Sequence, residues 1–279
     1  MQIEFISGKG GVGKSAVSAA VARLHARRGE RVLAMSMIPG GALASHLGLR
    51  RLGFVPELAI DGVHAMEVAR ADALEEYVRL YSPVPLVAQL GRAVRVFDVL
   101  AEAAPGVREI VTIGKVAYEA WEGSWDRIVV DAVPSGQLES HILAPEVIAE
   151  LIPTGRVRDQ AARIEQLLRD DTLVHLVTLA EELPITETHE TLARLETLAP
   201  TVAPVIANRL LAPPPSSGDL PESAPSAART ALALHAEISA EQTRWLAELA
   251  DGPRLPYLFG TDDPILVSEY LAKVMEAWR

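Results

Sequence analysis

The sequence predicts an α/β fold with a doubly wound, mostly parallel sheet. Short apolar runs typical of strands buried on both faces alternate with longer amphipathic stretches typical of helices. The first apolar run breaks into a glycine-rich turn at residues 8–15 and then opens an alanine-rich helical pattern. No internal repeat is present, and 279 residues suffice for one large α/β domain. We therefore expect residues 1–279 to form a single domain.

The expected strands are short apolar runs bounded by turn residues. Residues 31–36 are typical of them, because they are apolar on both faces, as strands inside a parallel sheet are. Residues 125–131 form a similar run that ends in an aspartate. We expect strands at residues 3–6, 31–36, 63–68, 125–131, 172–179, 202–207 and 254–258.

Amphipathic periodicity and glycine stops indicate the helices. We expect helices at residues 15–29, 42–48, 156–169, 185–198 and 264–278, and a long one that ends near Ala250. Residues 71–121 mix apolar and charged residues at helical spacing, with breaks at 82–85 and 104–106, and predict a small helical lid. Residues 211–227 are rich in proline and serine and predict a flexible loop.

The glycine-rich turn has the spacing G-x-x-x-x-G-K-[ST] of a phosphate-binding P-loop, which predicts a fold of the P-loop NTPase type. Glycines let several backbone N–H groups point at one anion, and the following helix adds the positive end of its dipole. Lys14 can reach the β- and γ-phosphates, and the Ser15 hydroxyl can bind Mg²⁺, so we expect ATP and Mg²⁺ here. The expected nucleotide-binding residues of this turn are Gly8, Lys9, Gly10, Gly11, Val12, Gly13, Lys14, Ser15 and Ala16.

Asp131 ends an apolar strand, at the edge where ligands bind in open α/β sheets. There it can hold Mg²⁺ through a water molecule, whereas the alternative is a strand-end aspartate that only makes a turn. The turn-rich segment 132–137 follows it. The P-loop upstream favours the magnesium interpretation.

Composition excludes several other classes of function. The net charge of −11 argues against a nucleic-acid-binding surface, which needs a basic stripe. The chain has no cysteine, so it has no disulfide or thiolate metal site, and we expect no zinc. Its histidines lack metal-ligand spacing. No apolar run reaches transmembrane length and no signal peptide precedes the first strand, so we expect a cytoplasmic protein without stable membrane insertion.

Lys9 makes the loop resemble the deviant P-loop of the MinD/ParA, nitrogenase-iron-protein and arsenite-pump (ArsA) group. In that group this lysine crosses a dimer interface to the nucleotide of the partner. The resemblance therefore implies a dimer that closes around two ATP molecules, with Lys9 and Lys14 as catalytic residues. Spacing alone indicates only a surface lysine near a phosphate.

Five further segments resemble the ArsA family, which includes the ATPase that targets tail-anchored membrane proteins. Residues 131–137 resemble its Asp-Thr-Ala-Pro-Thr-Gly-His switch, which senses the γ-phosphate. Residues 105–109 and 177–188 resemble its Pro-Gly-x-x-Glu segment and its stretch that ends in Glu-Thr. Asn208 and Arg209 match the strand-end pair that reads adenine, although Asn208 could also be a turn residue. Pro256 and Tyr257 lie where relatives pass a loop beside the base. The implied switch residues are Ile38, Pro39, Asp131, Pro134, Ser135 and Gly136.

The sequence also departs from this family. Relatives carry Ser-Thr-Asp-Pro after the second strand, and its aspartate positions the attacking water, but Ile38 stands at that place here. Such groups are often worth about 10²–10⁴ in rate, so slow hydrolysis or none is expected while ATP binding survives. The paired cysteines that clasp a zinc-bound dimer in tail-anchored-protein targeting factors are absent. The broad apolar groove expected for a transmembrane client is not evident in residues 71–121, where core packing is favoured.

Three functions fit these observations. The first is an ATPase of the ArsA type that works as a homodimer, or as a heterodimer with a paralogue, and couples nucleotide state to a protein client. The second is a non-hydrolysing ATP-binding scaffold or regulatory subunit, which Ile38 motivates. The third is a positioning ATPase of the MinD/ParA type that acts on a membrane or on DNA, with the amphipathic terminal helix as the candidate membrane contact. Packing of that helix on the sheet is favoured, because its charges are mixed in sign.

Overall fold

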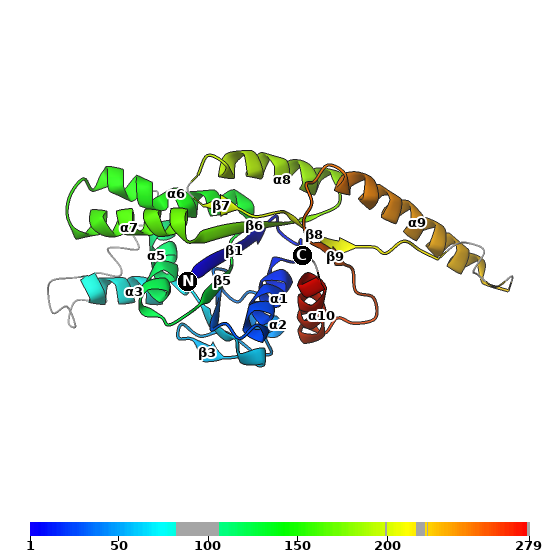
Figure 1. The fold of residues 1–279 in the computed structure, drawn as a ribbon, viewed down its shortest axis with the longest axis horizontal. Coiled ribbons are helices and arrows are strands. Elements are labelled where there is room, and N and C mark those ends of the chain that lie inside the picture. The colour runs from blue at the N-terminus through cyan, green and yellow to red at the C-terminus, as the bar shows by residue number, and fades with distance from the viewer. Residues whose placement is uncertain (82–105, 199, 216–220, 222, 278–279) are drawn as a thin grey trace.

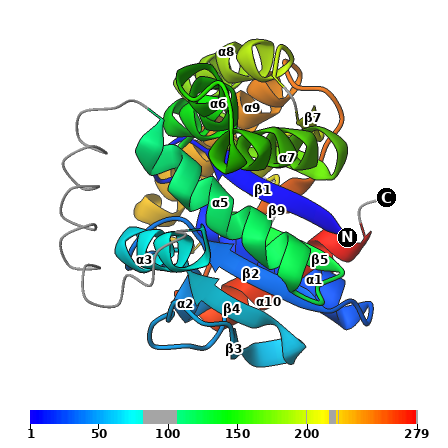
Figure 2. The same cartoon turned by 90° about the vertical axis from the view of Figure 1, so that its left-hand side faces the viewer.

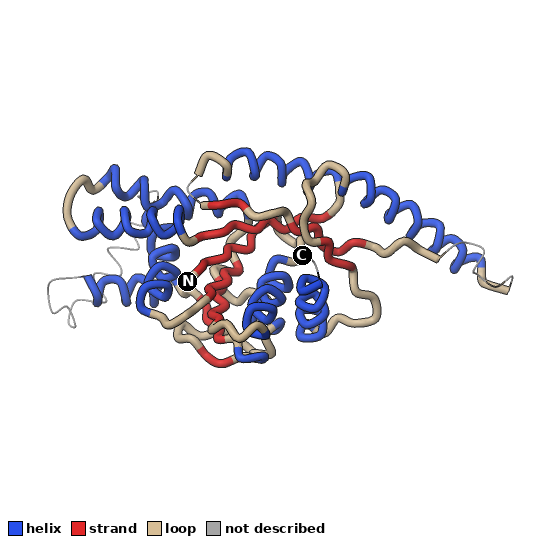
Figure 3. Tube along the Cα trace, in the orientation of Figure 1, coloured by secondary structure: helices blue, strands red, loops and turns tan. Residues whose placement is uncertain are grey.

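The computed structural model describes residues 1–81, 106–198, 200–215, 221 and 223–277 (Figure 1). A nine-stranded sheet runs in the order β3-β4-β2-β5-β1-β6-β8-β9, with β7 paired to β6. Every pair among these strands, which are red in Figure 3, is parallel within the described residues except the short β3–β4 pair. The strands are β1 (Gln2–Gly8), β2 (Val32–Ser36), β3 (Glu57–Leu58), β4 (His64–Glu67), β5 (Arg127–Asp131), β6 (Thr172–Leu179), β7 (Thr201–Val202), β8 (Ile206–Leu210) and β9 (Arg254–Pro256). This arrangement confirms the predicted mostly parallel α/β sheet.

Helices cover both faces of the sheet (Figures 1 and 2). Because successive side chains of a strand point to opposite faces, Val32 and Ala34 pack against the layer of α1, α2 and α10, whereas Leu33 and Met35 pack against the layer of α3 and α5–α8. The sheet is therefore a buried middle layer. The helices are α1 (Lys14–Arg27), α2 (Leu43–His46), α3 (Arg70–Tyr81), α5 (Val107–Glu122), α6 (Ser135–Leu151), α7 (Arg156–Asp170), α8 (Glu182–Leu195), α9 (Ser226–Leu246) and α10 (Pro264–Ala277), with a 3₁₀ turn at Ile60–Gly62.

The structure differs from the sequence prediction at several elements. The single strand expected at 202–207 is two strands, because Pro204 lies between them and has no N–H to donate to a ladder. The segment expected to be only a turn at 132–137 contains the start of α6, since Pro134 directly precedes the helix. Strand β3 was not predicted, because two residues carry no periodicity. The long helix ends at Leu246 rather than near Ala250.

The predicted lid and loop fall partly outside the described residues. Of the expected lid at 71–121, residues 82–105 lie outside the described part, including its expected breaks except for Gly106. The flanking helices α3 and α5 pack on the sheet, and the buried Lys115 of α5 binds Glu76 of α3 at 2.8 Å. Of the expected flexible loop at 211–227, residues 216–220 and 222 lie outside the described part, and α9 already begins at Ser226.

The terminal helix α10 packs on α1. Its Ser268, Leu271 and Ala272 are buried, and Arg23 of α1 donates to the Ser268 hydroxyl at 2.8 Å. Its apolar side is therefore used within the domain. Within the described ranges, no helix combines the length and the apolar character needed to cross a bilayer.

Candidate nucleotide site

The P-loop leaves β1 at the carboxyl edge of the sheet and leads directly into α1. Gly8 has φ of +147°, and a Cβ there would lie 2.1 Å from the backbone oxygen of Val177 on β6. Gly13 has φ of +92°, and a Cβ there would lie 2.4 Å from Nδ2 of Asn208. Both conformations and both close approaches require glycine. These two glycines therefore fix the loop against its neighbouring strands.

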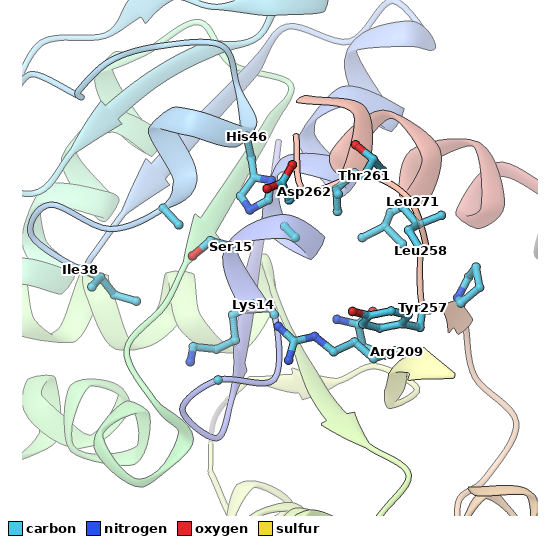
Figure 4. Close-up of a pocket in the computed structure, with 17 residues that line it drawn as sticks. Lys14, Ser15, Ile38, His46, Arg209, Tyr257, Leu258, Thr261, Asp262 and Leu271 are labelled. Carbon is cyan, nitrogen blue, oxygen red and sulfur yellow. The ribbon is translucent and has the colours of Figure 1, made fainter. Parts of the chain in front are cut away.

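A cavity of about 590 Å³ opens over this loop (Figure 4). Lys14 and Ser15 line it from the start of α1, and Ile38 lines it from the loop after β2. Arg209 and Tyr257 line it from the ends of β8 and β9. The other lining residues are Gly11, Gly13, Ala16, Ala42, His46, Asn208, Pro256, Leu258, Thr261, Asp262, Val267 and Leu271. The volume lies in the range of small-molecule and cofactor sites.

Lys14, which lines this cavity, and Asp131, at the end of β5, are two buried groups of opposite charge beside the P-loop. Burial lowers the pKa of Lys14, and the Asp131 charge opposes that shift. Burial raises the pKa of Asp131 to about 6, against hydrogen bonds from Ser15 and Ser18 and the charge of Lys14. The Lys14 ammonium donates to the backbone oxygen of Lys9 at 3.1 Å. A cation held on the loop suits a polyphosphate.

Ser15 and Asp131 meet as the sequence predicts. The Ser15 hydroxyl donates to Oδ2 of Asp131 at 2.7 Å, because β5 pairs with β1 and both strands end at the same edge. A hydroxyl beside a carboxylate is an oxygen-only donor set, which fits Mg²⁺. Within the described ranges no three His, Cys, Asp or Glu side chains gather into a metal cluster, so waters and phosphates would complete the shell.

Asn208 has a role that the sequence did not indicate. Its side chain is buried, and Nδ2 donates to the backbone oxygen of Val12 at 2.8 Å. It therefore braces the P-loop from the end of β8 as well as lining the cavity. The next residue, Arg209, has φ of +59°, which is uncommon outside glycine and favours a functional position.

The predicted switch residues lie on the loop after β2 and on the segment from the end of β5 to the first turn of α6. Pro39 is exposed on the loop after β2, where the carboxylate of Glu67 accepts the N–H of Gly40 at 2.8 Å. Pro134 directly precedes α6, and Ser135 and Gly136 lie in its first turn. The Ser7 hydroxyl donates to the backbone oxygen of Val133 at 2.8 Å, which joins this turn to β1.

Lys9 lies outside the large cavity. Its ammonium forms an ion pair with Glu187 of α8 in the same chain, and its side chain is 57% exposed. Lys9, Glu187 and Ser135 line a second cavity of about 10 Å³, together with Gly8, Leu176, Pro184, Thr188 and Thr191. That volume suits about one water molecule. This pairing connects the P-loop with α8 across 178 residues of sequence.

Three polar residues that line the large cavity were not predicted from the sequence. His46 comes from the end of α2, and Thr261 and Asp262 come from the loop before α10 (Figure 4). Nδ1 of His46 donates to the backbone oxygen of Pro264 at 2.8 Å, and burial lowers the pKa of this histidine. None of these residues stands in a motif. The only available signal was their position after strands that end at the ligand-binding edge.

Several known ATPases are similar to this chain in sequence. The chain is similar to the ATPase BagA of Mycobacterium tuberculosis, with 27% identity in an alignment of 227 positions that covers 75% of this chain and 65% of that protein. A putative arsenical pump-driving ATPase of Prosthecochloris vibrioformis is 28% identical over 261 residues, covering 79% of this chain and 64% of that protein. An ATPase ASNA1 homolog of Entamoeba dispar is 22% identical over 253 residues, covering 74% and 76%.

The chain thus spans about 65% of the length of BagA. Residues 1–152 match the profile of a family described as "Anion-transporting ATPase", and this range holds the P-loop, the loop after β2 and Asp131. It covers more than half of the 279 residues. The chain belongs to this ArsA family of ATPases.

Proposed function

We propose that this chain binds Mg-ATP, closes as a dimer around nucleotide and couples its nucleotide state to a protein partner, with slow hydrolysis. The observation that carries this proposal is the cavity over the P-loop, with Lys14 and Ser15 at its phosphate end and Asp131 bonded to Ser15. Arg209 and Tyr257 offer a guanidinium and an aromatic ring for a base. The partner is a client protein or a second subunit.

Different residues of the site would bind the phosphates and the Mg²⁺ ion. Backbone N–H groups of the P-loop and the Lys14 ammonium hold the phosphates. Ser15 and Asp131 would hold Mg²⁺, which when bound neutralises charge that develops on the phosphate oxygens. Asp131 would hold the ion through a water molecule. Its hydrogen bond with Ser15 keeps the Ser15 hydroxyl and the Asp131 carboxylate next to each other at the proposed Mg²⁺ position.

Slow hydrolysis follows from Ile38. This side chain lines the cavity from the loop after β2 and has no atom that accepts a proton or holds a water. Asp131 is fully buried and already accepts from Ser15, so it is poorly placed to orient an attacking water. Glu67 contacts the same loop, but its carboxylate accepts the N–H of Gly40.

We expect Lys14→Ala to weaken Mg-ATP binding by about 10- to 100-fold, because hydrogen bonds to charged groups are worth about 1.5–3 kcal/mol. Calorimetric titration of the purified chain with Mg-ATP measures this, and phosphate release measures turnover. Lys273→Ala is the control, since Lys273 is an exposed residue of α10 that pairs with Glu269. Equal ATP affinity in wild type and Lys14→Ala would contradict the assignment of the cavity.

Dimer closure requires Lys9 to leave Glu187. An exposed ion pair is worth about 0.2–1 kcal/mol, so the pair can hold Lys9 without nucleotide and yield when a partner phosphate competes for it. We expect Glu187→Gln to strengthen nucleotide-dependent dimerisation by up to about fivefold, and Lys9→Ala to weaken it. Sedimentation velocity with a non-hydrolysable ATP analogue measures both effects. Glu190→Gln, an exposed change on the same helix, should leave the dimer unchanged.

A second candidate function is a non-hydrolysing ATP-binding subunit that pairs with a paralogue. Ile38 favours it, because the site keeps its binding residues and lacks only a polar group at this position. Turnover by the purified chain decides between the two. Phosphate release above background that disappears in Lys14→Ala would exclude the non-hydrolysing subunit.

A further inference from the structure

One side of the large cavity carries polar side chains that the proposed binding of phosphates and magnesium does not use. His46 lines this side from the end of α2, and Thr261 and Asp262 line it from the loop before α10. Figure 4 shows these three residues across the cavity from Arg209 and Tyr257. We call His46, Thr261 and Asp262 the polar wall.

His46 offers the cavity a hydrogen-bond acceptor of fixed identity. Its Nδ1 lies 2.8 Å from the backbone oxygen of Pro264, and because that oxygen can only accept, Nδ1 carries the proton. Burial lowers the pKa of His46, which keeps the ring neutral at pH 7. In this neutral form Nε2 has a lone pair and accepts. Among the described residues Nε2 has no hydrogen-bond partner, so it is left for a ligand.

Contacts between α2, α1 and α10 hold His46 in place. The Ser268 hydroxyl of α10 donates to the backbone oxygen of His46 at 2.8 Å, and Arg23 of α1 donates to the Ser268 hydroxyl at 2.8 Å. Ser268 and Arg23 are both buried. The main chain and the ring of His46 are therefore positioned by the fold itself, which lowers the entropic cost of binding a ligand through it.

Asp262 has no structural task in its own loop. Its neighbours form the turn before α10, since Gly260 has φ of +82° and the Thr261 hydroxyl accepts the N–H of Asp263 at 3.2 Å. Oδ1 of Asp263 caps the helix by accepting the N–H of Ile265 at 2.9 Å. The Asp262 side chain is exposed, and within the described ranges its carboxylate forms no ion pair or hydrogen bond. It is therefore an unused acceptor on the lining of the cavity.

The chemistry of the polar wall excludes phosphate and suits hydroxyl groups. A carboxylate and a neutral imidazole Nε2 both accept, and a phosphate oxygen is itself a charged acceptor that the Asp262 carboxylate repels. In a nucleoside triphosphate the donors are the ribose hydroxyls and the amino group of the base. The ribose links phosphates to base, and Figure 4 shows His46 next to Ser15 of the P-loop, with Arg209 and Tyr257 on the other side. The wall is therefore placed for the sugar.

We propose that the polar wall binds the ribose of the nucleotide, with the Asp262 carboxylate and Nε2 of His46 accepting hydrogen bonds from its two vicinal hydroxyls. This inference rests on the nucleotide site proposed above and adds selection of ribonucleotides over deoxyribonucleotides. A site built to hydrogen-bond a ligand hydroxyl rejects the analogue that lacks it, because its own polar groups are then left unpaired. The base lies on the opposite side of the cavity, against Arg209 and Tyr257.

The test is calorimetric titration with the magnesium complexes of ATP, 2′-deoxy-ATP and 3′-deoxy-ATP. We expect wild type to bind ATP about tenfold more tightly than either analogue, which corresponds to about 1.4 kcal/mol. Asp262→Ala should bind ATP about tenfold more weakly and lose the preference over one analogue, and His46→Asn should lose the preference over the other. Asparagine keeps an amide N–H for Pro264 but has no atom in place of Nε2. Asp251→Ala, at an exposed position before β9 and at the opposite edge of the sheet, should match wild type.

The other outcomes separate this inference from the proposed nucleotide site. A wild-type chain that binds no ATP overturns both. ATP binding with equal affinity for the two deoxy analogues overturns the ribose inference alone, and so do variants that lose affinity for ATP and both analogues alike. Inosine triphosphate has an oxygen in place of the amino group of adenine. A preference for ATP over this analogue that disappears in Asp262→Ala or His46→Asn would assign the polar wall to the base and overturn its assignment to the sugar.

Discussion

Replacing Ile38 with aspartate is expected to raise ATP turnover by about 10²–10⁴-fold, the usual worth of a group that positions or deprotonates an attacking water. The change places a carboxylate on the loop after β2, where it lines the cavity with Lys14 and Ser15. The side chain of Ile38 is only partly buried, so the charge carries little desolvation penalty. Phosphate release under saturating Mg-ATP measures the effect.

Two companion variants make this result specific. Ile38→Asn has nearly the same shape as Ile38→Asp but is not a base, so it should recover less of the rate. Ile38→Asp/Lys14→Ala should lose the gain, because the phosphates are no longer held. An Ile38→Asp chain that binds ATP normally and turns over no faster than wild type would show that Ile38 does not occupy the position of the missing aspartate.

Replacing Glu4 with glutamine is expected to lower the free energy of unfolding by about 1.5–3 kcal/mol, the worth of a hydrogen bond to a charged group. Glu4 is buried in β1 and binds Arg127 at 2.9 Å, His25 at 3.0 Å and His175 at 3.1 Å. Its replacement leaves Glu30 as the remaining carboxylate partner of Arg127, at 3.0 Å, and of His25, at 2.9 Å. Urea unfolding measures the change. Glu165→Gln, which breaks an exposed pair with Arg169, is the control and should cost less than about 1 kcal/mol.

The same network gives the stability a pH dependence. Burial opposes the charge of Glu4, yet hydrogen bonds from His175 and His25 outweigh it and hold the pKa of Glu4 well below its usual value of 4.5. Burial also opposes the charge of His25, yet hydrogen bonds from Glu4 and Glu30 raise the pKa of His25 above 6.5. The Glu4 contribution is lost as pH falls through its lowered pKa, and the His25 contribution is lost as pH rises through its raised pKa.

The difference in stability between wild type and Glu4→Gln should therefore be largest between about pH 4.5 and 6.5 and smaller on either side. Unfolding curves at several pH values measure this difference. A difference that stays the same as pH rises well above 6.5 would contradict the assignment of His25 as the paired cation.

The positions of Lys14, Ser15 and Asp131 were predictable from local sequence and from one general property of parallel sheets. A strand, a glycine loop and a helix follow one another within residues 2–27, so Lys14 and Ser15 are placed by local sequence. Asp131 reached Ser15 because buried parallel strands end at one edge, although the sequence did not specify that β5 neighbours β1. Local chemistry and one topological rule were enough here.

The remaining parts depend on packing between segments distant in sequence. The pairing of Lys9 with Glu187 requires α8 to lie beside the P-loop, and the contact of Asn208 with Val12 requires β8 to lie two strands from β1. His46 lines the cavity because α2 and α10 pack together. The hydrophobic periodicity of a single sequence does not specify which distant elements pack side by side. The start of α6 was missed because proline and glycine at 134–136 indicate a turn as readily as a helix start.

The glycines of the P-loop answer to different constraints. At Gly8 and Gly13 a side chain would collide with Val177 and Asn208 in the chain itself, whereas a Cβ at Gly10 would meet open space and Gly10 has no positive φ. Positions 8 and 13 are therefore restricted by contacts within the chain itself. Position 10 is restricted only by what the loop must hold. A relative that no longer binds nucleotide could therefore vary residue 10 and still need glycine at residues 8 and 13. Substitution at residue 10 alone would then indicate loss of the ligand while the fold is unchanged.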